Sequence, residues 1–271
     1  MTDSKISLGI FIWFGYRIPI PERLRLIREN GFETVLHWWD DSFLELEKFT
    51  KEEQADLIRK EGLYIENAHL QFNDVNHLWF DTLDGQTVLE NYLSDLDGLA
   101  KYEIPVAVLH LSTGQGSPPI SDIGMRRIHS LVKMAEKCGV RIALENVRHT
   151  HILNHVLDSV ESPMLGLCYD SGHDYIWNPT PYDLLEKYKD RLFALHLHDN
   201  AGQNDDHIAL GTGKINWDIV WAGIANSIYS GSYSLEMDSI EIPELQTPQE
   251  YLKLCFESAV NALQVKKVWN E

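Results

Sequence analysis

The segment MLGLCYDSGH (residues 164–173) carries the pattern that decides the fold of this 271-residue chain. Its first part, MLGLCYD, is mostly apolar, has the length of a buried strand and ends at the carboxylate of Asp170. His173 follows three positions later, and the amphipathic stretch YDLLEKYKDR (182–191) comes next. The segment therefore predicts a buried strand and then a helix, with an acid and an imidazole at the exposed end of the strand.

The same strand and helix unit recurs along the whole chain. The predicted strands span residues 6–14, 34–39, 64–70, 106–112, 141–146, 164–170, 192–199 and 233–238. Amphipathic stretches follow them, and Gly31, Gly62 and Gly139 stand where a glycine commonly ends a helix. Eight such units in this length predict an α/β fold, a single (β/α)8 TIM barrel spanning residues 1–271. A doubly wound sheet is the alternative, which the lack of a G-x-G-x-x-G motif after the first strand disfavours.

Composition and charge narrow the range of partners. The formal net charge is -18, from 41 acidic and 23 basic residues. Nucleic-acid binding relies on clustered Lys and Arg, so this charge disfavours a nucleic-acid partner. The chain has no apolar run of about eighteen residues and no basic, cleavable leader, which argues against a membrane partner and predicts a cytoplasmic protein. The three cysteines are odd in number and lie in apolar stretches, as expected of reduced, buried thiols.

Acidic and imidazole side chains mark the ends of the last six predicted strands. They are His69, His110, Glu145, Asp170 with His173, His196 with His198, and Glu236. In a (β/α)8 barrel all strand ends open into one mouth, so these side chains converge although they are dispersed in the sequence. Oxygen and nitrogen donors of this kind are the usual ligands of divalent metals. The pattern therefore predicts a metal site at the mouth of the barrel.

Each of these residues also has a structural interpretation. A lone histidine at a strand end, such as His69, is more often a hydrogen-bonded loop or core residue than a ligand. Glu145 and Glu236 are costly to bury without a partner, and a bound cation would compensate them. A structural salt bridge could do the same, and Arg148 and Lys214 are the basic residues near the strand ends.

Five motifs, in their order and spacing, resemble the xylose isomerase-like TIM-barrel superfamily. They are ALEN (143–146), CYDSGH (168–173), LHLHD (195–199), DDHIALGTGKINW (205–217) and SLEMD (234–238). That superfamily holds sugar epimerases and isomerases of the tagatose 3-epimerase and inosose dehydratase types, together with endonuclease IV. The resemblance covers nearly the whole chain and implies a metal-dependent isomerase or epimerase of a sugar or related polyol. It also implies that the chain could form a homo-oligomer.

The resemblance assigns roles to the residues at the strand ends. One divalent ion (Mn, Co, Mg or Zn) would be held by Glu145, Asp170, His196 and Glu236. Glu145 and Glu236 would also exchange a proton with the substrate through an enediolate. This fits the residue types, because removing a proton beside a carbonyl needs a Lewis acid and a positioned base.

Further residues are predicted to contact the substrate. His173 would bind a substrate hydroxyl, and His198, which has the same strand parity as His196, could orient the substrate. An apolar wall for a sugar ring could come from the ends of the first two predicted strands, at Trp13, Phe14, Trp38 and Trp39. Plain packing at the barrel rim is the alternative for these aromatic residues.

Departures from the epimerase pattern support a rival interpretation. All nine ligand types of the three-metal site of endonuclease IV can be matched, at His69, His110, Glu145, Asp170, His173, His196, Asp205, His207 and Glu236. A multi-metal phosphodiester hydrolase is therefore the alternative, and the number of ions stays open between one and three. The acidic charge counts against it, as does Ser171-Gly172 before His173, where endonuclease IV has Thr-Cys. A non-catalytic barrel that binds a sugar or a metal is the third interpretation.

Overall fold

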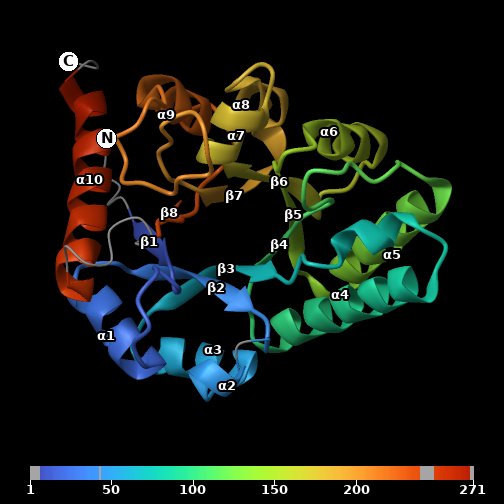
Figure 1. Cartoon of the computed structure of the whole chain (residues 1–271), viewed down its shortest axis with the longest axis horizontal. Coiled ribbons are helices and arrows are strands. Elements are labelled where there is room, and N and C mark those ends of the chain that lie inside the picture. The colour runs from blue at the N-terminus through green and yellow to red at the C-terminus, as the bar shows by residue number, and fades with distance from the viewer. Residues whose placement is uncertain (1–6, 43, 239–246, 269–271) are drawn as a thin grey trace.

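Eight parallel strands curve into a nearly closed barrel in the computed structural model, which describes residues 7–42, 44–238 and 247–268 (Figure 1). The strands are β1 (Leu8–Phe11), β2 (Thr34–Trp39), β3 (Tyr64–Leu70), β4 (Val106–Leu109), β5 (Arg141–Glu145), β6 (Leu165–Asp170), β7 (Leu192–His196) and β8 (Tyr233–Leu235). Consecutive strands pair from β1 to β7, and β8 pairs with β1. Between β7 and β8 the amide of Leu197 donates to the carbonyl of Ser234 at 2.9 Å, and the amide of Glu236 donates to the carbonyl of Leu197 at 3.0 Å. These two bonds complete the ring.

This arrangement confirms the predicted (β/α)8 barrel. The doubly wound alternative is wrong, because such a sheet stays open at both edges. Each predicted strand is present, but five of them end earlier than predicted, at Phe11, Leu109, Glu145, His196 and Leu235. As a result His110 and Glu236 stand just beyond the strands, in the loops that form the mouth.

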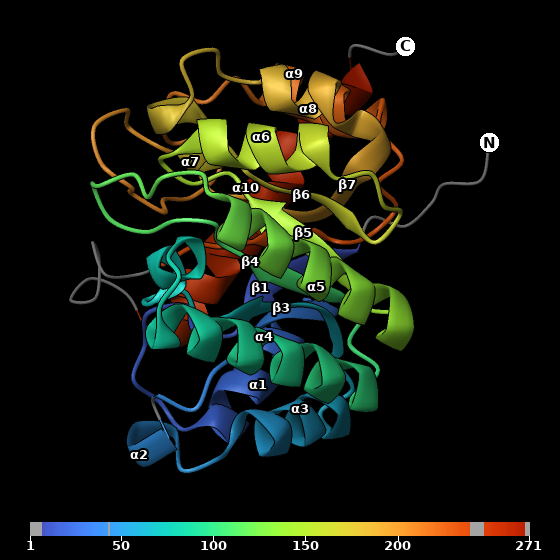
Figure 2. The same cartoon turned by 90° about the vertical axis from the view of Figure 1, so that its right-hand side faces the viewer.

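Helices cover the outside of the barrel, with α4 and α5 packed side by side (Figure 2). The longer helices are α1 (Ile20–Glu29), α3 (Lys51–Lys60), α4 (Leu83–Lys101), α5 (Asp122–Cys138), α6 (Thr150–Ser159), α9 (Trp217–Ala225) and α10 (Pro248–Val268). The short ones are α2 (Leu44–Glu47), α7 (Ser171–Trp177) and α8 (Asp183–Lys187), with the 3-10 turns η1 (Val75–Trp79) and η2 (Lys189–Arg191). In the part of the chain that the structure describes, no helix combines the length and the apolar character needed to cross a membrane.

Helix α3 shows how local sequence sets these boundaries. The side chain of Thr50 accepts from the amide of Glu53, and the carboxylate of Glu53 accepts from the amide of Thr50, which together form a capping box. Gly62 follows the last turn with a φ of 81°, a left-handed conformation that glycine adopts without strain. The predicted helix end at this glycine is confirmed.

An apolar floor lies inside the barrel beneath the mouth. It consists of Val106, Val108, Ala143, Cys168, Phe193 and Ala194, which form a buried cluster of their own. Side chains two positions apart share one face of a strand, as Ala143 and Glu145 do in β5. The polar residues at the strand ends therefore point toward the barrel axis above this floor.

Candidate active site

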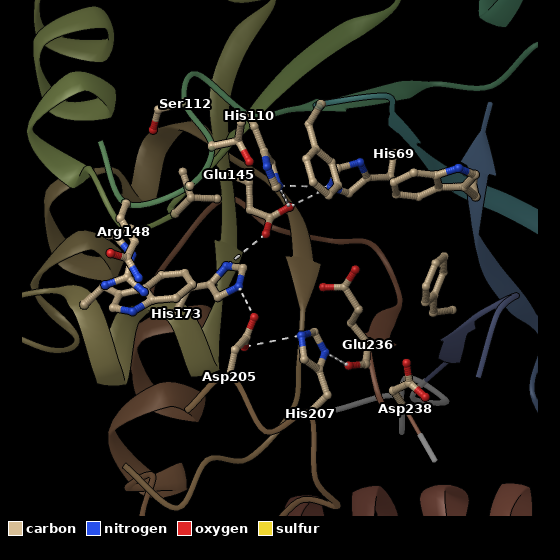
Figure 3. A pocket seen from close by; sticks show the side chains of 18 residues that line it. His69, His110, Ser112, Glu145, Arg148, His173, Asp205, His207, Glu236 and Asp238 are labelled. Carbon is tan, nitrogen blue, oxygen red and sulfur yellow. Dashed lines mark hydrogen bonds and ion pairs between the residues drawn. The ribbon is translucent and has the colours of Figure 1, made fainter. Parts of the chain in front are cut away.

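A cavity of about 420 Å³ opens at the carboxyl ends of the strands (Figure 3). Its acidic and imidazole lining consists of His69, His110, Glu145, His173, Asp205, His207, Glu236 and Asp238. Its aromatic lining consists of Phe11, Trp38, Phe72 and Trp177. The cavity lies where the polar strand ends were predicted to meet.

Glu145, the last residue of β5, lies in the middle of the polar lining. Its Oε2 lies 3.1 Å from Nε2 of His69, 3.3 Å from Nε2 of His110 and 3.1 Å from Nδ1 of His196. Its Oε1 lies 3.0 Å from Nδ1 of His173. Four imidazoles that lie on or just after four different strands thus surround one buried carboxylate, as the barrel geometry predicts for residues far apart in the chain.

The four residues predicted to hold one metal ion come together. Glu145, Asp170, His196 and Glu236 each place a ligand atom within 4.8 Å of the other three. All four are buried, and the Nδ1 of His196 lies 3.1 Å from an oxygen of each glutamate. Among the described residues no Lys or Arg pairs with these carboxylates, so the salt-bridge alternative is wrong. Three buried carboxylates and one imidazole form a donor set that fits a divalent cation.

Asp170 is held by partners that fix its orientation. The side-chain amide of Asn146 donates to the carbonyl of Asp170 at 2.8 Å, and the amide of Asp170 donates back to Asn146 Oδ1 at 2.8 Å. The Oδ1 of Asp170 accepts from the amide of His173 and so caps α7, while Nε2 of His198 lies 3.1 Å from both carboxylate oxygens. A side chain at Gly172 would overlap the ring of His198, so this close approach requires glycine.

A second group of potential ligands lies beside the first. His173 Nε2 lies 3.0 Å from Asp205, whose other oxygen lies 3.3 Å from Nε2 of His207. His207 has a φ of 46°, a strained conformation for a residue other than glycine and one that is common at functional sites. Asp199 anchors the loop that carries this group by accepting four hydrogen bonds, including one from the indole of Trp217 at 2.9 Å.

The two groups form one continuous cluster through His173, which contacts Glu145 with Nδ1 and Asp205 with Nε2. The structure therefore brings together all nine residues predicted as metal ligands. Figure 3 shows the members that line the cavity converging on it, with dashed lines for the contacts among them: His69, His110, Glu145, His173, Asp205, His207 and Glu236.

Burial and charge act in opposite directions on this cluster. Burial raises the pKa of Glu145, but the imidazoles of His110 and His196 outweigh it and hold the pKa well below its usual range. Burial likewise raises the pKa of Glu236, and His196 lowers it to about 2. In His173 burial lowers the pKa, and the surrounding aspartates raise it well above its usual range. Imidazolium protons thus compensate the carboxylates, and a divalent ion would displace these protons.

Four of the residues predicted to contact the substrate do not line this cavity, namely His198, Trp13, Phe14 and Trp39. His198 is fully buried behind Asp170, and its ring stacks on that of His207 at 3.9 Å. Trp13 lies beyond the end of β1 and lines an adjoining cavity of about 450 Å³, where the guanidinium of Arg23 lies 4.6 Å from its ring. His198 is therefore placed to orient Asp170, and Trp13 to form part of the neighbouring cavity.

The aromatic wall comes instead from Trp38, Phe11 and Phe72. Trp38 stacks on His69 with ring centres 5.1 Å apart, and Phe72 stacks on His110 at 4.3 Å. Phe14 and Trp39, the other two residues predicted for this wall, are buried in the core. The wall thus packs directly against two of the potential ligands and limits the rotation of their rings.

Sequence reasoning missed Trp177 and gave Arg148 no role in the cavity. Trp177 stacks on His173 with ring centres 4.5 Å apart, and the guanidinium of Arg148 lies 4.7 Å from the centre of the Trp177 ring. The i, i+4 spacing of His173 and Trp177 was an available signal, because residues four apart are neighbours on a helix. Phe72 lies in a loop after β3, and no pattern in the sequence places it at the mouth.

The model of the xylose isomerase-like TIM barrel family matches residues 24–255 of the chain. The chain belongs to this family. An uncharacterized relative of this xylose isomerase-like barrel, y4fM of Sinorhizobium fredii, is 32% identical over 280 residues, 86% of this chain and 88% of the relative. An inosose dehydratase of Bacillus thuringiensis is 27% identical over 146 residues, which cover 46% of this chain and 48% of that enzyme.

Solved structures share the architecture of this xylose isomerase-like barrel. A D-tagatose 3-epimerase-like protein has a TM-score of 0.77 at 21% identity, over 97% of this chain and 100% of that one. The IOLI protein with a bound zinc atom has a TM-score of 0.79 at 17% identity, over 95% of this chain and 98% of that one. At these identities the similarity establishes the fold.

Proposed function

We propose that the chain is a divalent-metal-dependent isomerase or epimerase acting on a sugar or a related polyol or keto compound. The observation that carries the proposal is that two buried glutamates of the cavity lining, Glu145 and Glu236, both lie 3.1 Å from Nδ1 of His196. The names of the epimerase-like and inosose dehydratase neighbours support the same class of substrate.

The proposed chemistry is proton transfer at a carbon beside a carbonyl. Glu145, Asp170, His196 and Glu236 would hold the ion, which when bound polarises the carbonyl and hydroxyl oxygens of the substrate. One glutamate then takes the proton and the other returns it through an enediolate. Both are weak bases because their pKa values are lowered, so the transfer depends on close positioning. His173 would bind a substrate hydroxyl, and Trp38 would contact the sugar ring.

The test combines metal analysis with hydrogen exchange. Purified protein is assayed for bound metal and then incubated with ketoses, inososes and hydroxypyruvate in deuterated solvent. A substrate loses one C–H signal, which identifies both the compound and the reacting carbon. Failure to find a bound or restoring metal, or exchange that is unaffected by chelation, would contradict the proposal.

Separate Glu145→Gln and Glu236→Gln variants test the roles of the glutamates. A catalyst should lose exchange by at least about a hundredfold while keeping measurable ligand affinity, because general-base catalysis contributes that much. Glu66→Gln is the matched control: Glu66 is a buried glutamate that accepts from Tyr229 and Ser232, outside the cavity. It should exchange at the normal rate. Ligand binding without any exchange by the native protein, with only affinity lost in the two variants, would favour the non-catalytic barrel.

The second group, His173, Asp205 and His207, supports the phosphodiester hydrolase as the rival, because it could hold further ions. The charge of -18 counts against it, since a polyanion would meet an acidic protein. Incubation with a duplex that contains an abasic site decides the matter: cleavage at a rate above that of proton exchange would reverse the order of the two proposals.

A further inference from the structure

One permanent side-chain cation lies at the edge of the cavity. Arg148, which follows β5, is the only Lys or Arg among the described residues that line it. Four carboxylates, those of Glu145, Asp205, Glu236 and Asp238, line the rest. Figure 3 shows Arg148 and Asp238 at opposite sides, with Glu145 and His173 between them. The imidazoles, or a bound divalent ion, offset these carboxylates, so among the described lining residues Arg148 is the permanent cation that remains to pair with an anionic group of a ligand.

The guanidinium of Arg148 is held in place without an acidic partner. It lies 4.7 Å from the centre of the Trp177 ring, which itself stacks on His173 at 4.5 Å. Among the described residues no hydrogen bond or ion pair involves this guanidinium. In a chain with 41 acidic and 23 basic residues, an arginine without a carboxylate partner at the edge of a cavity keeps all its donors available to a ligand.

A chain of contacts leads from Arg148 to the proposed reacting groups. The guanidinium lies 4.7 Å from the Trp177 ring, that ring lies 4.5 Å from the ring of His173, and His173 lies 3.0 Å from Glu145. A ligand whose carbonyl lies near Glu145 and whose chain extends past His173 would place its far end near the guanidinium.

We propose that the substrate carries a carboxylate at the end of its chain remote from the reacting carbons, and that Arg148 binds this carboxylate. The inference rests on the proposed function and names its substrate class, a keto sugar acid. The planar guanidinium matches a carboxylate with two parallel hydrogen bonds and one charge of each sign. A phosphate ester would bring nearly two negative charges to a single cation in an acidic cavity, so the carboxylate is the better match.

The test uses ligands that differ at one position. D-fructose, D-fructuronate and D-fructose 6-phosphate differ only at C6, and D-tagatose and D-tagaturonate form a second pair. Calorimetry on the metal-loaded protein gives Kd for each ligand. At least one of the two acids should bind at least tenfold more tightly than its neutral parent, a difference of about 1.4 kcal/mol, and fructuronate should bind more tightly than the phosphate.

Two arginine variants isolate the contact. In Arg148→Gln the ratio of the two Kd values should fall to about one. Arg141→Gln is the matched control, because Arg141 also lies on an aromatic ring, 5.0 Å from that of Phe193, at the start of β5 and outside the cavity. Arg141→Gln removes the same charge but should keep the native ratio of the Kd of the neutral sugar to that of its acid.

Three results would overturn the proposal: no tenfold preference for either acid, a preference that survives in Arg148→Gln, or tighter binding of the phosphate. The measurement is separate from the proton-exchange test. If the preference is found but no substrate exchanges, the proposed reaction fails while the carboxylate site stands. If exchange occurs on neutral sugars without any preference, the reaction stands and the carboxylate site fails.

Discussion

Replacing Asn146 by alanine tests how the end of β6 positions Asp170. The Asn146 side chain makes a reciprocal pair of buried hydrogen bonds with the backbone of Asp170, both at 2.8 Å. Alanine removes both partners and leaves no side chain that could replace them. The carboxylate of Asp170 is one of the four proposed ligands, so the stability of the protein and its metal affinity should fall together.

The magnitude follows from the two backbone groups. The buried amide of Asp170 loses its partner, which costs about 1–3 kcal/mol. The carbonyl of Asp170 loses the donor of Asn146 as well, which costs about 1 kcal/mol more. The free energy of unfolding of Asn146→Ala should therefore be about 2–4 kcal/mol lower than that of the native protein. Metal affinity should fall about 10–100-fold, as is common when a residue that orients a ligand is removed.

The assay is urea unfolding of the metal-free protein together with metal titration against a competing chelator. Asn76→Ala is the matched control, because Asn76 makes the same reciprocal pair with the backbone of Thr113, at 2.9 and 3.0 Å, and touches none of the four residues proposed to hold the ion. It should lose stability but keep its metal affinity. If Asn146→Ala binds metal within twofold of the native protein, or no worse than Asn76→Ala, the positioning argument is refuted.

Two further changes test other parts of the barrel. Burial lowers the pKa of His37 from 6.5 to about 4, so its contribution to stability is complete above about pH 6.5 and is lost as the pH falls toward 4. In His37→Gln the free energy of unfolding should therefore fall by about 3 kcal/mol less over this pH range than in the native protein, and an equal fall in both would contradict the argument. Gly213→Ala should lower the free energy of unfolding by about 1–3 kcal/mol and weaken binding of a second ion, because a Cβ there overlaps Asp199, which anchors the loop carrying His207. Gly116→Ala is the control in the same urea and metal titrations, because the space around Gly116 is open, and equal behaviour of the two variants would argue against the clash.

The fold was predictable because its signal repeats. The strands at residues 34–39 and 64–70 each follow a helix-ending glycine, Gly31 or Gly62, and the structure has both strands with the predicted bounds. The ends of other strands were not predictable. In LFALHLHD (192–199), for example, apolar and polar residues keep alternating past His196, although the pairing of β7 with β6 ends there. Where a strand ends depends on its packing and pairing with the neighbouring strands, which the pattern of one strand does not reveal.

The ligands were predictable and their supporting residues were not. Glu145 and Asp170 are the last residues of their strands, so parity and barrel topology together placed them. Asn146 stands beside Glu145 in the same motif, but its reciprocal contact with β6 depends on the register between strands. His198 shares parity with His196 but lies past the end of β7, where the alternation no longer fixes its direction.

The residues that separate the proposed functions lie on the wall of the cavity, away from the ligands. The nine potential ligands match both a sugar isomerase and a phosphodiester hydrolase, so they do not distinguish the two. Phe11, Trp38 and Phe72 present flat apolar rings beside the ligands, which suits the face of a sugar better than a hydrated phosphate backbone. A duplex would also need several cations along this wall, whereas Arg148 is the only one among the described lining residues. One permanent cation and an aromatic wall are the features that the proposed small ligand with a single negative charge would need.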